Sequence, residues 1–198
     1  MKISPKLLLL LIGIGLHLLT APPTSSAQSF TQETCTLDPA TSQVNFTLGG
    51  VIHTVHGTFH LEEGRILFER TTGNMSGTII VSSTSGNSGN ATRDRRMTSE
   101  VLKAQSFPKI TFEPTHFSGA LPSTGKSVLT VEGVFALIGI PHNVKLPMTV
   151  QVLDTHCEAT GSISIPYTAW GLKDPSTLML RVEKEVQIGL VLSGTLQR

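Results

Sequence analysis

The sequence predicts an all-β protein, an antiparallel barrel or sandwich of about eight strands with one short helix. Apolar residues fall on alternate positions from Gln43 onward, which is typical of strands with one buried side and one solvent-facing side. Charged residues make up only 15% of the chain, and Gly, Ser and Thr are abundant. This composition favours strands and turns over long amphipathic helices.

The first 27 residues have the three parts of a secretory signal peptide. Lys2 and Lys6 precede an apolar run over 7–19, which is too short for a comfortable membrane span, and small residues end at Ala27. We therefore expect cleavage near Ala27 and a mature domain over 28–198, in the periplasm or secreted, without a membrane span. An uncleaved N-terminal anchor is the alternative.

The charge of the expected mature domain is close to neutral. Without the two signal lysines, 13 basic residues face 14 acidic ones, a formal charge of −1. Such a balance does not suggest a nucleic-acid partner. Roughly 170 residues make one domain, large enough for a core or a walled cavity. The oligomeric state stays open, with a dimer as one option.

The alternation defines the successive strands. Its apolar sets begin at Val44, Val55, Ile66, Met75, Ile110, Leu129, Val144, Ala159 and Val186. We expect a turn at Gly64, between the second and third sets. One helix is expected over about 94–104, with Asp94 as its N-cap, because Met97, Val101 and Leu102 have helical spacing.

Two features of the connections complete this interpretation. The loop 82–90 is nearly all Ser, Thr, Gly and Asn, so we expect it to be exposed and mobile. Glycines also recur inside otherwise good strands, where glycine normally weakens a sheet. These glycines are Gly57, Gly77, Gly133 and Gly161. Coiling of a barrel wall, or room in its lumen, would explain them. The alternative is a sandwich with bulges.

The sequence contains no strong catalytic signature, and we do not expect an enzyme. It lacks a G-x-S-x-G nucleophile elbow and a Gly-rich phosphate loop. His53, His56 and His60 are the best hint of a metal or haem site. His56 and His60 share one strand face, but four strand residues separate them by roughly 13 Å, too far to bind one ion together. We therefore expect these three histidines to lie on the surface, and we expect no metal or cofactor.

Two further clusters have alternative interpretations. Arg93, Arg95 and Arg96 lie beside the predicted helix, where they form either a solvated helix start or a basic rim for an anionic headgroup. Trp170 lies in an apolar patch with Tyr167 and Leu172, which either plugs a barrel end or contacts a bound lipid.

Cys35 and Cys157 are the two cysteines of the chain. An oxidising compartment would permit a single disulfide between them. The sequence leaves this pairing open, because it does not show whether their Cα atoms come within bonding range.

Several segments, taken in order, resemble the YceI-like family of lipid- or polyisoprenoid-binding proteins. They are 37–46 (LDPATSQVNF), 55–59 (VHGTF), 89–97 (GNATRDRRM), 107–112 (FPKITF) and 131–140 (VEGVFALIGI). The resemblance covers about 37–197. Tyr167 and Ala169 stand where many members have an arginine and an acid, and Ile138 stands where histidine is frequent.

This resemblance implies a lipocalin-like extended barrel whose apolar lumen encloses a long apolar lipid of polyisoprenoid or quinone-like type. The expected function is carriage or sequestration of that lipid. The alternatives are a haem or metal protein using the histidine cluster, and a stress-related structural module with a filled core. The candidate lumen residues are Val44, Phe46, Phe59, Ile79, Val81, Ile110, Phe112, Val131, Phe135, Val144, Leu146, Met148, Ile163, Trp170, Ile188 and Leu190.

Overall fold

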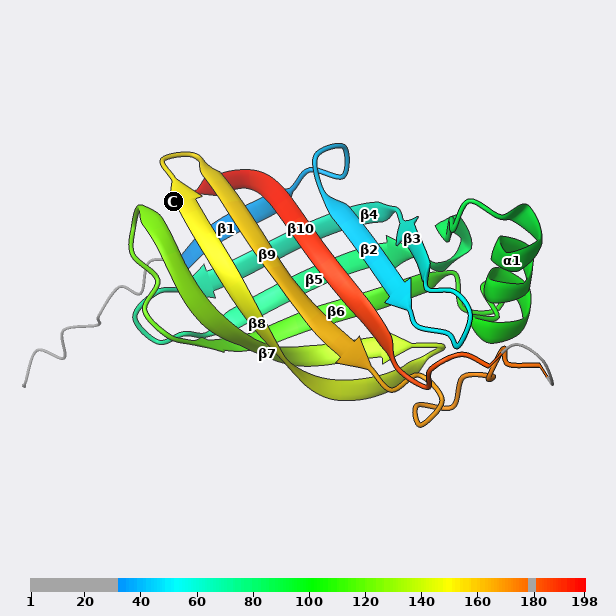
Figure 1. The fold of residues 1–198 in the computed structure, drawn as a ribbon. Coiled ribbons are helices and arrows are strands. Elements are labelled where there is room, and N and C mark those ends of the chain that lie inside the picture. The colour runs from blue at the N-terminus through cyan, green and yellow to red at the C-terminus, as the bar shows by residue number, and fades with distance from the viewer. Residues whose placement is uncertain (1–31, 178–180) are drawn as a thin grey trace, which may run out of the picture.

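The computed structural model describes residues 32–177 and 181–198, so the predicted signal peptide lies outside the described residues. Figure 1 shows long, tilted strands and a small helical element at one end. The strands in the described part are β1 (Gln32–Leu37), β2 (Gln43–Leu48), β3 (Val55–Phe59), β4 (Leu61–Glu69), β5 (Met75–Ser82), β6 (Lys109–Ser118), β7 (Gly125–Leu137), β8 (Ile140–Leu153), β9 (His156–Ile165) and β10 (Val186–Gln197). The helical turns are η1 (Ser83–Ser85), α1 (Ala91–Arg96) and η2 (Met97–Val101).

The strands close into an antiparallel barrel of eight staves, which confirms the predicted fold class. β10 pairs with β9 along one edge. Along its other edge it pairs with β2 over 187–191 and with β1 over 194–197. β1 and β2 are thus two halves of one stave, and β4 and β3 pair with them as the two halves of the next. Since the β1–β10 pairing closes the cylinder, the sandwich alternative is wrong.

The longest hairpin, β7–β8, shows why these residues form strands. Its register runs without a shift from Gly125 opposite Val152 to Leu137 opposite Ile140. Alternate residues are apolar and face the interior, as the pattern predicts. The two turn residues, Ile138 (φ 49°) and Gly139 (φ 76°), have the left-handed backbone that a two-residue hairpin turn requires. This backbone is strained for the β-branched Ile138, whose side chain is buried near the helical end.

The predicted turn at Gly64 is wrong. The chain passes from β3 to β4 at His60 without reversing its direction. β3 pairs antiparallel with β2 and β4 pairs antiparallel with β1, so β3 and β4 run the same way along one stave. Gly64 lies inside β4, where a Cβ atom would come within 2.5 Å of the Leu37 side chain. Close packing across the wall, instead of a chain reversal, accounts for this glycine.

The helix is present but begins earlier than predicted. Asn90, and not Asp94, is the N-cap, since its side chain accepts hydrogen bonds from the backbone N–H groups of Thr92 (3.1 Å) and Arg93 (3.0 Å). Asp94 accepts instead from the backbone N–H of Ser88, at 2.9 Å. The described helix is far too short to cross a membrane.

The loop 82–90 is exposed only in part, at Thr84, Asn87, Gly89 and Asn90. Ser83 is buried and donates its hydroxyl to the Phe107 carbonyl at 2.5 Å. Asn87 exchanges two backbone hydrogen bonds with Thr58 of β3, at 2.8 and 2.9 Å. These two bonds pair the backbone groups of Thr58 on the outer edge of β3 and fix the loop to the barrel wall.

Candidate functional site

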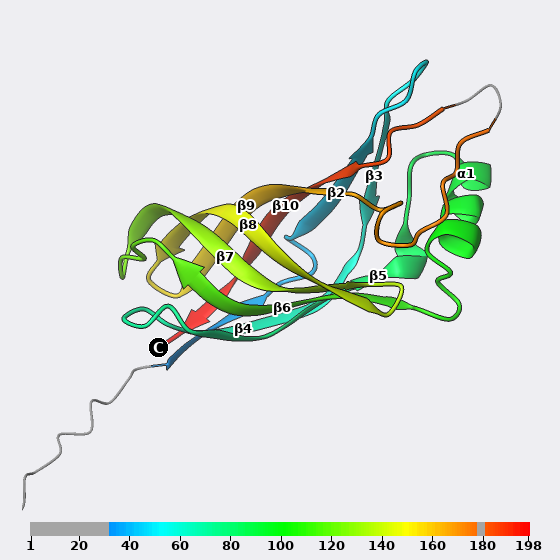
Figure 2. The same cartoon turned by 90° about the horizontal axis from the view of Figure 1, so that it is seen from below.

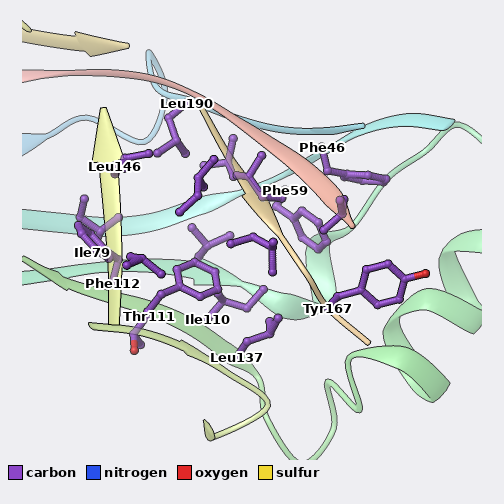
Figure 3. Close-up of a pocket in the computed structure, with 18 of the residues that line it drawn as sticks. Phe46, Phe59, Ile79, Ile110, Thr111, Phe112, Leu137, Leu146, Tyr167 and Leu190 are labelled. Atoms are coloured by element: carbon purple, nitrogen blue, oxygen red, sulfur yellow. The ribbon is translucent and has the colours of Figure 1, made fainter. Parts of the chain in front are cut away.

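The barrel encloses an apolar cavity of about 710 Å³. Residues from all eight staves line it, and Figure 3 shows side chains from several strands converging on it. The predicted lumen residues that do line the cavity are Val44, Phe46, Phe59, Ile79, Val81, Ile110, Phe112, Val131, Phe135, Val144, Leu146, Met148, Ile163, Ile188 and Leu190. Their contact with a ligand stays a prediction.

The placement of Trp170 in the lumen is wrong. Trp170 is not among the residues that line the cavity. Its ring stacks on His142 of β8, with centroids 3.9 Å apart and planes at 4°, and lies 5.9 Å from the ring of Phe135. The turn after β9 therefore directs Trp170 against the β7–β8 hairpin, while its neighbours Tyr167 and Leu172 reach the cavity.

The lining also contains apolar residues that were not named as candidates. Leu37, Ile66, Phe68, Leu129 and Leu192 are examples. Most occupy alternate positions in strands already recognised, so extending the same alternation would have found them. Leu121, in contrast, comes from the loop between β6 and β7, for which no periodic signal exists.

Some glycines of the wall lie opposite large side chains of the lining. Phe46 is the cross-strand partner of Gly57, and a Cβ there would lie 2.4 Å from the Phe46 ring. Met148 has the same relation to Gly161, where a Cβ would lie 2.3 Å from the Met148 sulfur. Glycine at these two positions therefore leaves the Phe46 ring and the Met148 sulfur room to pack over the neighbouring strand. This packing gives a physical reason for both glycines.

One end of the cavity is closed by covalent and ionic links. A disulfide joins Cys35 of β1 to Cys157 of β9, and both cysteines line the cavity. Beyond them the buried Glu33 forms an ion pair with Arg70, whose Nη2 lies 2.7 Å from Glu33 Oε2. Arg70 also donates to the carbonyl of Leu121, at 3.2 Å. A buried charge needs such partners, and together they cap this end.

The opposite end carries the polar part of the lining and forms the mouth. It is bordered by α1 and η2, by the β2–β3 connection and by the segment after β9. Apart from Glu158, the charged side chains of the lining come from this end; they are Arg93, Arg96, Glu100, Lys173 and Arg181. The cavity therefore has an apolar shaft and a charged rim, as an amphipathic ligand requires.

The three predicted headgroup arginines are placed differently. Arg93 and Arg96 reach the mouth, but Arg95 does not line the cavity. Arg93 donates to the hydroxyl (2.7 Å) and the carbonyl (2.9 Å) of Ser88, which orients its guanidinium group. Arg96 lies 3.7 Å from Glu100. The structure thus separates two arginines at the rim from one on the outer side of the helix.

The segment after β9 crosses the mouth and is tied down by polar contacts. Lys173 donates to Glu100 of η2 at 2.5 Å, and this hydrogen bond and the lysine charge lower the pKa of Glu100. Lys184 pairs with Asp174 and, mainly through its hydrogen bond, lowers the pKa of Asp174 to about 2. Tyr167 donates to the Glu183 carbonyl at 2.7 Å, and burial raises the pKa of Tyr167 to about 12.

The three histidines do not form a metal centre in the structure. His53 lies at the mouth, while His56 is hydrogen-bonded to the Thr47 hydroxyl at 3.0 Å. The backbone N–H of His60 donates to Ser85. Within 32–177 and 181–198, no three His, Cys, Asp or Glu side chains are grouped closely enough to hold a metal ion.

Several solved structures share this fold. BcnA of Burkholderia cenocepacia has a TM-score of 0.66 at 20% identity, over 80% of this chain and 99% of that chain. A polyisoprenoid binding domain from Saccharophagus degradans, implicated in plant cell wall breakdown, has a TM-score of 0.61 at 17% identity, over 81% and 97%. The YceI protein of Campylobacter jejuni has a TM-score of 0.54 at 12% identity, over 68% and 81%.

These identities are low enough that the likeness concerns the fold alone. No curated relative matches the chain. The family model of the YceI-like domain, however, matches residues 35–193, from the first cysteine to within β10. This match spans most of the chain and contains at least part of every stave of the barrel. The chain therefore belongs to the YceI-like domain family.

Proposed function

We propose that this protein encloses a long apolar lipid of the polyisoprenoid type in its barrel and carries or sequesters it, without catalysing a reaction. The observation that carries the proposal is the apolar cavity of about 710 Å³. Ligand sites typically measure about 300–1,000 Å³ and are lined mainly by apolar groups. A protein with a filled core would lack such a space, so the cavity counts against the structural-module alternative.

The driving force for such binding is the removal of hydrocarbon from water. Each buried carbon unit contributes about 0.8 kcal/mol, so a prenyl chain needs no strong polar contact to bind. The similarity in fold to a polyisoprenoid binding domain supports the same ligand class. The cap at Glu33 and Arg70 supports entry of the lipid from the end that carries α1, with its tail toward the disulfide.

The headgroup of the lipid would lie at the rim. Arg93 and Arg96 border the mouth, and a guanidinium group suits a phosphate or another anionic headgroup. The proposed location is the periplasm, or the outside of the cell. Two features support it, the signal-like sequence before residue 28 and the Cys35–Cys157 disulfide, which is typical of oxidising compartments.

The main test compares two neighbouring residues of β10 with opposite orientations. Leu190 lines the cavity, whereas Val191 is 41% exposed on the outside. Native mass spectrometry and lipid extraction of the purified protein should find a bound apolar lipid in the wild type. Its amount should fall in L190Q and stay unchanged in V191Q. A wild-type protein without bound or exchangeable lipid would refute the proposal.

A second comparison tests the headgroup arginines. R93Q/R96Q removes both rim charges, and R95Q removes one charge of the same helix that does not line the cavity. Hydrogen bonds to charged groups contribute about 1.5–3 kcal/mol, so the affinity for a prenyl phosphate should fall about tenfold or more in R93Q/R96Q. The affinity for the corresponding prenyl alcohol should change little. Equal losses in R95Q would contradict the assignment.

A further inference from the structure

The connection between β2 and β3 presents two adjacent apolar side chains to solvent. Val51 is 82% exposed and Ile52 is 60% exposed. Figure 2 shows this connection projecting beyond the barrel at the end that carries α1. Single exposed apolar residues are common on protein surfaces, but a neighbouring pair at the apex of a projection is a feature of surfaces that contact an apolar phase.

The tip is held in place by the segment that precedes β10. The backbone N–H of Val51 donates to the Arg181 carbonyl at 3.1 Å, and that of Glu183 donates to the Gly49 carbonyl at 2.8 Å. Gly50 and Val182 form a β-bridge between these two bonds. These backbone bonds hold Val51 and Ile52 at the tip, away from the barrel wall.

The tip is continuous with the mouth of the cavity. Gly50, Ile52 and His53 belong to the lining, together with Val182 on the adjoining segment. Ile52 thus extends the apolar wall of the lumen to the outermost part of the molecule. A lipid leaving the cavity along this wall would emerge beside Val51 and Ile52.

Positive charge surrounds the same end. Arg93, Arg95 and Arg181 are exposed, and within the described part of the chain none of them lies within ion-pair distance of a carboxylate. Glu183, whose carboxylate lies beside Gly49, offsets one of these charges. Exposed arginines next to an apolar tip complement a lipid surface with anionic headgroups, to which basic residues are attracted.

We propose that the β2–β3 tip docks this protein on an anionic lipid membrane by inserting Val51 and Ile52 into the interface, with the mouth facing the bilayer. Docking would serve the passage of lipid between the bilayer and the barrel, and this purpose rests on the proposed function. The docking itself is argued from the tip alone. A lipid surface fits better than a protein partner, since a stable protein interface needs about 800 Å² on each side, far more than two side chains provide.

The test measures binding of the purified protein to vesicles by flotation. The vesicles contain phosphatidylcholine with or without phosphatidylglycerol. V51S/I52S removes the apolar tip, and V128S/V191S is its matched control, because Val128 (71% exposed) and Val191 (41% exposed) lie on the outer face of the barrel wall. The partition coefficient on anionic vesicles should fall about tenfold or more in V51S/I52S and stay near the wild-type value in the control. Raising the salt concentration should weaken wild-type binding.

The outcomes separate docking from lipid carriage. Wild-type vesicle binding that V51S/I52S retains, or that V128S/V191S loses equally, would overturn the docking proposal. Capture of a protein partner by the tip without vesicle binding would also overturn it. If the wild type docks through the tip but carries no lipid, docking stands and the proposed function fails. If the wild type carries lipid but V51S/I52S binds vesicles as strongly as the wild type does, docking through the tip fails and the proposed function stands.

Discussion

Ala159 offers a way to test whether the depth of the lumen sets the length of the bound chain. It lies on β9, two residues after the disulfide cysteine Cys157, and lines the closed end of the cavity. Its neighbours across the sheet are Val150 and Leu192, which also line the cavity. A tryptophan at this position would project into the deepest part of the lumen and shorten it.

The size of the effect follows from the hydrocarbon displaced. An isoprene unit has about five carbons, and each carbon removed from water contributes about 0.8 kcal/mol. If the indole ring of A159W takes the place of one such unit, the longest chain that fits wild type should lose about 4 kcal/mol. That loss corresponds to about a thousandfold in affinity, while shorter chains should bind nearly as before.

The assay is mass spectrometry of lipids extracted from the protein after equilibration with prenyl alcohols of graded length. The matched control is T160W, because the next residue of β9 is exposed on the outer face. We expect A159W to shift the bound population to shorter chains and T160W to match the wild type. Thermal unfolding checks that both variants fold. An unchanged length distribution in a folded A159W would refute the idea that the chain tail reaches the closed end.

Three further predictions concern stability. C35S/C157S should lower the free energy of unfolding by about 2–5 kcal/mol in urea titrations, because the disulfide bridges a sequence separation of 122 residues in the unfolded chain. E33Q should cost about 3 kcal/mol in the same assay, since it leaves an arginine at the capped end without its buried partner. The Asp174–Lys184 pair should stabilise the segment after β9 fully above pH 4 and lose this effect as the pH falls toward 2, because the pKa of Asp174 is lowered from 3.8 to about 2 in the folded state. Hydrogen exchange of that segment should therefore accelerate over this pH window, and a flat profile there would contradict the assigned pair.

The alternation of apolar residues predicted most of the cavity lining because it follows from the local geometry of the strand backbone. Successive strand side chains point to opposite sides, so Val144, Leu146 and Met148 had to share one face wherever the strand lay. The same logic fails outside regular strands. Trp170 sits in a turn, and only packing against His142 decides which way its ring points. The prediction of Asp94 as the N-cap was wrong because residue type alone does not place a cap: Asn and Asp cap helices equally well, and the structure puts Asn90 in that position.

The sequence by itself determined the class of the protein: strands with one apolar side, a family resemblance carried by ordered segments, and a basic cluster beside a short helix. Only the tertiary structure decided that β1 and β2 share one stave, that Cys35 meets Cys157, and that Arg93 and Arg96 face the mouth while Arg95 does not. The physical reason is the range of the interactions. Periodicity and propensity act between neighbours in the chain, whereas closure of the barrel, and with it the space inside, depends on contacts between residues far apart in sequence.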